Sequence, residues 1–255
     1  MRPAIAPLGW AVLLILAVLA TPARSQDRTR PPVGGVSSLA DAMIFYLARG
    51  SAGACGPGCS EWIAAEGAVQ WDSYKRLLAL LARIGERKIP VILKVQGKGS
   101  LNVAAAMGKI IREHRLDVSL GETRVVQCRG ATDDACFALK RGGEPLVADI
   151  NRSFADCDVV CVLILAGGVH RTLPSGARVV ITPTHITNRL APNVSQERQE
   201  GLKSQFGDQF RLYLTQMGVS PQVVDIIDHS TESGRATPLS RNDWLRLGIV
   251  TDLAL

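Results

Sequence analysis

The residues best suited to chemistry in this 255-residue chain are its six cysteines and four histidines. An even number of cysteines indicates disulfides if the chain leaves the cytoplasm, or thiolate ligands for a metal ion. Fifteen disulfide connectivities are open, and only the Gly-Pro-Gly turn between Cys55 and Cys59 favours a particular pair. The Cys-x3-Cys spacing matches zinc sites poorly, and no histidine lies at a matching offset. We therefore expect disulfides, no metal and no cofactor, with these candidates: Cys55, Cys59, Cys128, Cys136, Cys157 and Cys161.

The amino-terminal residues predict the compartment in which those cysteines would be oxidised. Arg2 precedes an apolar run from Trp10 to Ala20, and the small residues Ala23 and Ser25 follow it. This order is typical of a cleavable signal peptide, which we place at residues 1–25. The run is too short for a membrane span. We expect a periplasmic or secreted protein that touches a membrane only if the signal remains uncleaved.

The composition limits the classes of partner. Hydrophobic residues make up 47% and charged residues 20%, which describes an ordinary globular domain. The net charge of +6 is mild, and only three tyrosines and five phenylalanines could stack on bases, so nucleic-acid binding is not expected. We place a leader and one short element at residues 26–54 and a single domain at residues 55–255.

The hydrophobic pattern alternates between helical and extended segments. Helices are expected at residues 71–84, 101–113 and 158–166, within 190–217, after 220–221, and at 239–247. Strands are expected at residues 61–65, 90–95, 116–120, 123–127, 169–172, 178–182 and 249–250. Residues 39–47 fit either a helix or a strand, and 130–154 is expected to be loop-rich. This alternation predicts a layered α/β domain with parallel strands.

Four short segments then occur in a recognisable order: Gly-Lys-Gly-Ser before a helix, Cys-Asp-Val-Val-Cys before Gly-Gly-Val-His-Arg, Pro-Ser-Gly-Ala-Arg-Val-Val-Ile before Thr-Pro, and a final Leu-Ser-Arg-Asn-Asp-Trp-Leu. This order resembles the proteolytic subunit of the Clp protease, within the crotonase-like superfamily, and especially its exported, cysteine-bearing members. The resemblance covers residues 55–252. It implies a layered α/β domain of repeated strand–strand–helix units and a serine–histidine peptidase.

The residues that the resemblance assigns to catalysis are altered in this chain. The position of the nucleophilic serine falls on Val159, and that of the histidine falls on Thr182. Neither side chain can take over the missing role. Lys98 replaces a glycine of the loop that would help to form the oxyanion hole. The third, acidic residue is not assigned by the resemblance.

These alterations favour a catalytically degenerate homologue that binds a peptide or small ligand, or acts as a scaffold. The resemblance alone implies that it forms a homo-oligomer. Export separates it from the ATP-driven unfoldases of the Clp system and argues against acyl-CoA chemistry. The alternative is an active hydrolase with a relocated site, in which His185 serves as base for Cys161 or a loop serine. In an oxidising compartment we expect Cys161 to be bonded instead.

Overall fold

The computed structural model describes residues 42–153, 155–185 and 195–253, so the expected signal peptide and most of the leader lie outside the described residues. Seven α-helices and one short 3₁₀ helix are present in this part of the chain. They are α1 (Ser73–Ile84), α2 (Leu101–Glu113), η1 (Val126–Cys128), α3 (Asp133–Arg141), α4 (Val159–Leu165), α5 (Gln196–Gln216), α6 (Gln222–Ser233) and α7 (Arg241–Arg246). No helix among these residues is both long enough and apolar enough to cross a membrane.

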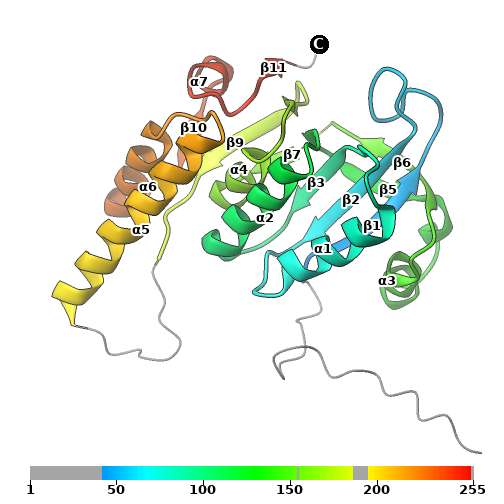
Figure 1. Cartoon of the computed structure of the whole chain (residues 1–255), viewed down its shortest axis with the longest axis horizontal. Coiled ribbons are helices and arrows are strands. Elements are labelled where there is room, and N and C mark those ends of the chain that lie inside the picture. Colours follow the sequence, from blue (N-terminus) through cyan, green and yellow to red (C-terminus); the bar gives the residue numbers. More distant parts are fainter. Residues whose placement is uncertain (1–41, 154, 186–194, 254–255) are drawn as a thin grey trace, which may run out of the picture. The chain divides into compact units, whose positions relative to one another are not determined.

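Eleven strands form two sheets within the described residues (Figure 1). The strands are β1 (Ile44–Arg49), β2 (Glu61–Gly67), β3 (Val91–Val95), β4 (Val118–Leu120), β5 (Glu122–Val125), β6 (Leu146–Asn151), β7 (Ala155–Cys157), β8 (Arg171–Leu173), β9 (Ala177–Ile181), β10 (Thr237–Leu239) and β11 (Asp252–Leu253). The larger sheet has the order β11-β8-β4-β3-β2-β1-β6-β5, and the smaller one has the order β10-β9-β7.

The expected layered α/β architecture is confirmed, but the large sheet is mixed rather than wholly parallel. Its strands β2, β3, β4, β8 and β11 run parallel, as the alternation of strands and helices requires. Strand β1 pairs antiparallel with β2 because the short loop closed by Cys55 and Cys59 joins them directly. The folded unit therefore includes β1, which precedes the domain start expected at residue 55.

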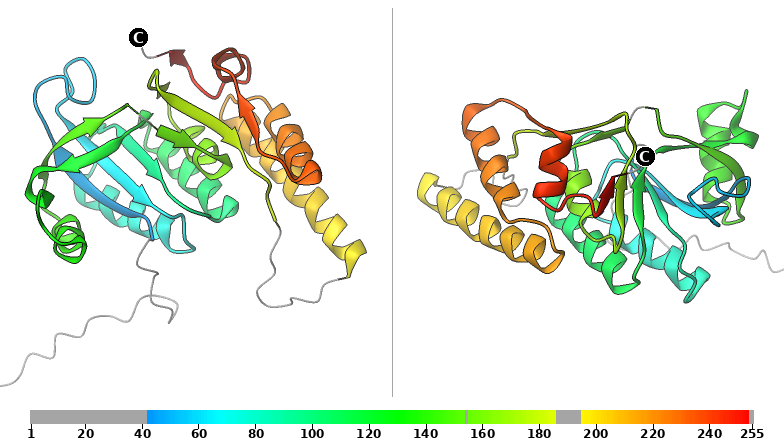
Figure 2. Two further views of the ribbon diagram at one scale, coloured as in Figure 1. Left: turned by 180° about the vertical axis from the view of Figure 1, so that it is seen from behind. Right: turned by 90° about the horizontal axis from the view of Figure 1, so that it is seen from above.

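The alternation of side chains along β2 divides the core between the two faces of the sheet. Ile63 and Ala65 face the helical side and belong to a large apolar cluster with α1, α2 and α4. Trp62 and Ala64 face the opposite side and belong to a smaller cluster with β5, β6 and the partly buried Phe137 of α3. Views from behind and from above show α3 on the side away from α1 and α2 (Figure 2). The sheet is thus covered on both faces.

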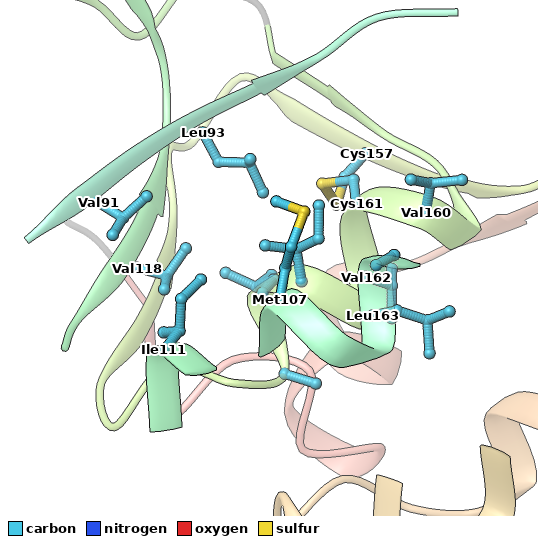
Figure 3. Close-up of a cluster of buried hydrophobic side chains, with 14 of the residues drawn as sticks. Val91, Leu93, Met107, Ile111, Val118, Cys157, Val160, Cys161, Val162 and Leu163 are labelled. Carbon is cyan, nitrogen blue, oxygen red and sulfur yellow. A yellow bond between two sulfur atoms is a disulfide. The ribbon is translucent and has the colours of Figure 1, made fainter. Parts of the chain in front are cut away.

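Helix α4 is the most deeply buried helix, since all seven of its residues are buried (Figure 3). It packs against α2 at a point where two backbones nearly touch: a Cβ atom added at Gly167, just after α4, would lie 2.1 Å from the Gly108 carbonyl oxygen. The Tyr213 hydroxyl of α5 donates to the Leu163 carbonyl at 2.6 Å and closes the same junction from outside. Only glycine permits this approach.

Two arginines fix the carboxyl end of α4. Arg112 on α2 donates to the carbonyl oxygens of Ala166, Gly167, Gly168 and Met217 at 2.9–3.0 Å. Arg171 on β8 donates to the carbonyls of Gly168, Met217 and Gly248 at 2.9–3.2 Å. These groups come from the ends of α4 and α5 and from the turn after α7, where helices leave carbonyls unpaired. The arginine pair therefore joins three helix ends to the sheet.

Two further sequence-based expectations are wrong. Residues 130–154 are not loop-rich, because they contain α3, a turn and the whole of β6. Helix α3 has only nine residues and none is fully buried, so it is shorter than the stretch over which a helical apolar pattern is recognised. Its remaining signals are the cap at Thr132, acidic residues in its first turn and basic residues in its last.

The final strand also differs from expectation. Ile249 and Val250 were expected to form it, but their backbone N–H groups bind the Trp244 carbonyl and continue the end of α7. Both side chains are buried in the core. The strand forms two residues later, at Asp252–Leu253, where pairing with β8 is available.

Replacing Gly167 tests the close contact of α2 and α4. We expect Gly167→Ala to lower the free energy of unfolding by about 1–3 kcal/mol or more, because its methyl group would strike backbone. The matched control is Gly201→Ala in the exposed part of α5, where nothing lies within 4 Å of the new methyl group. That change should raise stability by about 0.5–1 kcal/mol. Urea denaturation measures the free energy of unfolding of both variants. Equal effects of the two changes would contradict the close contact at Gly167.

Candidate functional site

The amino end of α4 is where the sequence places the altered nucleophile. Val159 is the first residue of α4 and is 2% exposed. Cys157, at the end of β7, and Cys161, in the first turn of α4, are both buried and form a disulfide across this position. The thiol of Cys161 is therefore consumed in a bond. Figure 3 shows the disulfide beside Val160, above Met107 of α2.

The loop expected to help form an oxyanion hole does reach the same place. Lys98 lies between β3 and α2 with its side chain exposed. The next residue, Gly99, is so close to α4 that an added Cβ atom would lie 3.0 Å from a Val160 methyl carbon and 3.0 Å from the Val69 Cβ. The backbone of this loop thus lies against the Val160 side chain in the first turn of α4.

The position of the altered histidine lies at the same end of the smaller sheet. Strands β7 and β9 run parallel, with Cys157 opposite Val179. Because parallel strands end at one edge, Thr182, just after β9, extends towards the edge from which α4 begins. The chain after Thr182 is held against α6, since Thr184 N–H binds the Thr231 hydroxyl at 3.1 Å. His185 is exposed and is the last described residue before residues 186–194.

A carboxylate that the sequence analysis did not identify caps the first turn of α4. Asp158 is the N-cap residue, and its Oδ1 accepts the Cys161 N–H at 3.0 Å. Its carboxylate also receives the Val160 N–H. Burial raises the pKa of Asp158, while these backbone N–H groups partly oppose the rise. Donors that could receive a substrate oxyanion here are already occupied by an internal anion.

The six cysteines pair completely, which confirms the expectation of disulfides. The pairs are Cys55–Cys59, as favoured by the intervening turn, Cys128–Cys136 and Cys157–Cys161. Within the described ranges, no group of three or more His, Cys, Asp or Glu side chains could hold a metal ion. The chemistry of the cysteines is therefore structural, and it fixes the start of α4 and the start of α3.

A second polar cluster, on the opposite face of the sheet, escaped the sequence analysis. Lys140 of α3 donates to Glu66 of β2 at 2.6 Å, and its ammonium lies 5.3 Å from the centre of the Tyr46 ring. The Thr123 N–H binds the other Glu66 oxygen at 3.2 Å, and Trp62 donates to the Thr123 hydroxyl at 3.0 Å. No sequence signal brings these residues together, because they lie on four separate elements.

Comparison with known proteins gives the following findings. No protein-family model and no curated protein matches the sequence. Similar solved structures include a membrane-bound stomatin-specific protease, 1510-N (11% identity, TM-score 0.42, 73% of this chain and 76% of that chain). They also include ClpP1 from Listeria monocytogenes (14%, 0.42, 73% and 90%) and a peptidase from Plasmodium falciparum (9%, 0.43, 74% and 92%). At these values the similarity concerns backbone arrangement and says nothing of activity.

The protonation of Asp158 gives a test of the carboxylate in α4. Because its pKa is raised in the folded state, ionised Asp158 costs stability once the pH exceeds the ordinary aspartate pKa of about 3.9. Asp158→Asn removes this cost and keeps a good cap. We expect its free energy of unfolding to rise relative to wild type between about pH 3 and pH 7, as measured by urea denaturation at each pH.

Asp243→Asn provides the control of opposite sign. Hydrogen bonds from Ser240 and Arg246 lower the pKa of Asp243, so its ionised form stabilises the folded state. That variant should lose stability relative to wild type as the pH rises over the same range. Parallel pH dependences of the two variants would show that the Asp158 carboxylate is not penalised by burial.

Proposed function

We propose that this chain is an exported Clp-like protein that binds or scaffolds peptides without hydrolysing them. The observation that carries the proposal is the first turn of α4, where a valine 2% exposed occupies the position of the nucleophile. Valine offers no oxygen or sulfur that could attack a carbonyl. The neighbouring Cys161 is bonded to Cys157 and offers no thiolate either.

The electrostatics of the same turn support this proposal. A peptidase stabilises the negative oxygen of its tetrahedral intermediate with N–H groups that are free to receive it. Here the Asp158 carboxylate already binds the N–H groups of Val160 and Cys161. A second negative charge beside it would be repelled. Both the side chain at residue 159 and the occupied N–H groups of this turn thus favour binding over hydrolysis.

The disulfides support a location outside the cytoplasm. Three of them in one domain are typical of an oxidising compartment, where thiols are not kept reduced. There the chain would act without the cytoplasmic unfoldases that deliver substrates to Clp chambers. Self-association belongs to the same proposal, and α5 exposes Leu212 to solvent on a largely polar surface. Light scattering on the purified protein measures it.

The proposal is tested by offering the protein both reactive probes and peptides. We expect no residue to react with a fluorophosphonate or with iodoacetamide, because nucleophile and free thiol are missing. A tryptic digest of casein should be partly retained by the protein, and mass spectrometry should find no new peptide ends. Retention separates a binding protein from an inert one.

The competing hypothesis, a hydrolase with a relocated site, predicts the opposite result. It requires one labelled residue whose labelling is lost in His185→Ala but kept in His229→Ala, the matched control on α6. New peptide ends that disappear with the same variant would also overturn the binding proposal.

A further inference from the structure

The second polar cluster is built like a receptor for an alkylammonium group. Its parts are the Glu66 carboxylate, the face of the Tyr46 ring and the backbone of β5 at Thr123. Carboxylates and aromatic faces are the two groups that attract ammonium ions most strongly. Here both act on one cation, the side chain of Lys140, at 2.6 Å and 5.3 Å. The cluster is secluded, since the side chains of Lys140 and Glu66 are 17% and 12% exposed.

The underlying surface also holds a buried hydroxyl, that of Tyr46. Tyr46 is 1% exposed, and its hydroxyl lies close enough to Glu66 and Thr123 for both to act on its pKa as hydrogen-bond neighbours. None of these contacts has the geometry of a regular hydrogen bond among the described residues. Burial and the Glu66 charge raise the pKa of Tyr46, so the hydroxyl stays protonated and able to donate.

The element that delivers Lys140 is weakly held. We call residues 130–143 the α3 flap. None of the residues of α3 is fully buried. Phe137 is the only residue of α3 whose side chain packs on the smaller apolar cluster, the one that contains Trp62 and Ala64. Glycines with positive φ lie at both ends of the flap, Gly130 at 76° and Gly143 at 91°. Such residues allow a backbone rotation that other residues resist.

A disulfide decides which end of the flap can move. Cys136, in the first turns of α3, is bonded to Cys128 at the end of η1. This bond links the amino-terminal part of α3 to η1, which directly follows strand β5. The carboxyl-terminal part of α3, which carries Lys140, is held by the ion pair with Glu66 and by the contact of Phe137. Movement of this part away from the sheet would expose Glu66 and the Tyr46 ring together.

We propose that the surface beneath the α3 flap is a binding site for a lysine side chain of a partner peptide, and that Lys140 fills it as an internal substitute ligand. The incoming ammonium would take the place of Lys140 between the Glu66 carboxylate and the Tyr46 ring. The site lies on the opposite face of the sheet from α4, so it does not rest on the altered chemistry at Val159.

The first experiment measures the affinity of an ammonium probe after the internal ligand is removed. The probe is Nα-acetyl-lysine N-methylamide, and its uncharged counterpart is the norleucine compound. Because a tethered group competes at an effective concentration in the millimolar range, Lys140→Ala should bind the lysine probe about tenfold more tightly than wild type, or better. Calorimetry measures this, and the norleucine compound should not bind.

Two variants show whether the affinity belongs to this site. Adding Glu66→Gln to Lys140→Ala should abolish binding of the lysine probe. Lys203→Ala, which removes a lysine paired with Glu232 on the surface, should leave binding as in wild type. Equal binding of the two probes to Lys140→Ala, or none of either, would overturn the proposal. Circular dichroism of the same Lys140→Ala/Glu66→Gln variant, which removes both charges of the ion pair, separates loss of folding from loss of the site.

The second experiment uses the unmodified protein and asks whether the flap opens. With the lysine probe roughly a hundredfold above the dissociation constant of Lys140→Ala, the α3 amides should exchange hydrogen faster, while those of α2 should not. A static ion pair would bind a probe only after mutation and would show no such change. Unaltered hydrogen exchange in α3 would therefore show that the flap does not open to admit the probe. Neither result depends on whether the chain hydrolyses peptides.

Discussion

Two arginine side chains bind the unpaired carbonyls of three helix ends, and the rest of the domain depends on this junction. Arg112 and Arg171 both donate to the carbonyls of Gly168 and Met217, so α2, α4, α5 and β8 meet at one point. No carboxylate is needed, because the carbonyl ends of helices carry partial negative charge. Burial, and then the neighbouring Arg112, lower the pKa of Arg171 to about 10, which still leaves it charged at neutral pH.

The junction makes the position of α4 independent of the side chain at residue 159. Helix α4 is fixed at its carboxyl end by the arginines and at its amino end by the Cys157–Cys161 bond and the Asp158 cap. None of these contacts uses the side chain at position 159. The contacts that hold α4 would therefore remain if residue 159 were changed. The loop at Gly99 still reaches the first turn of α4, because its approach depends on small residues and backbone.

The two faces of the sheet differ in how they are closed. The helical face is sealed by a continuous apolar cluster, which includes Met107, Ile111 and Leu163. The far face is closed in part by charge, since Lys140 of α3 must reach Glu66 to complete it. An apolar contact is satisfied by any neighbouring hydrocarbon, whereas a buried ion pair is satisfied only by an opposite charge. The far face is therefore the one at which an external cation could compete.

The sequence by itself determined those helices and strands in which apolar residues recur at a regular spacing along the segment. The helix at Leu101–Glu113 and the strand within residues 90–95 follow directly from apolar spacing, and the Cys55–Cys59 bond follows from the turn between its cysteines. The prediction that Val159 occupies the position of the nucleophile also comes from the sequence alone, because the motifs around that residue are contiguous. Only the tertiary structure decided the antiparallel pairing of β1, the presence of α3, the filling of the α4 turn by Asp158, and the two polar junctions. The partners in those junctions lie far apart in sequence, 105 residues for Arg112 and Met217 and 74 for Lys140 and Glu66. Such contacts carry no local pattern, since they form only when the chain has already brought distant elements together.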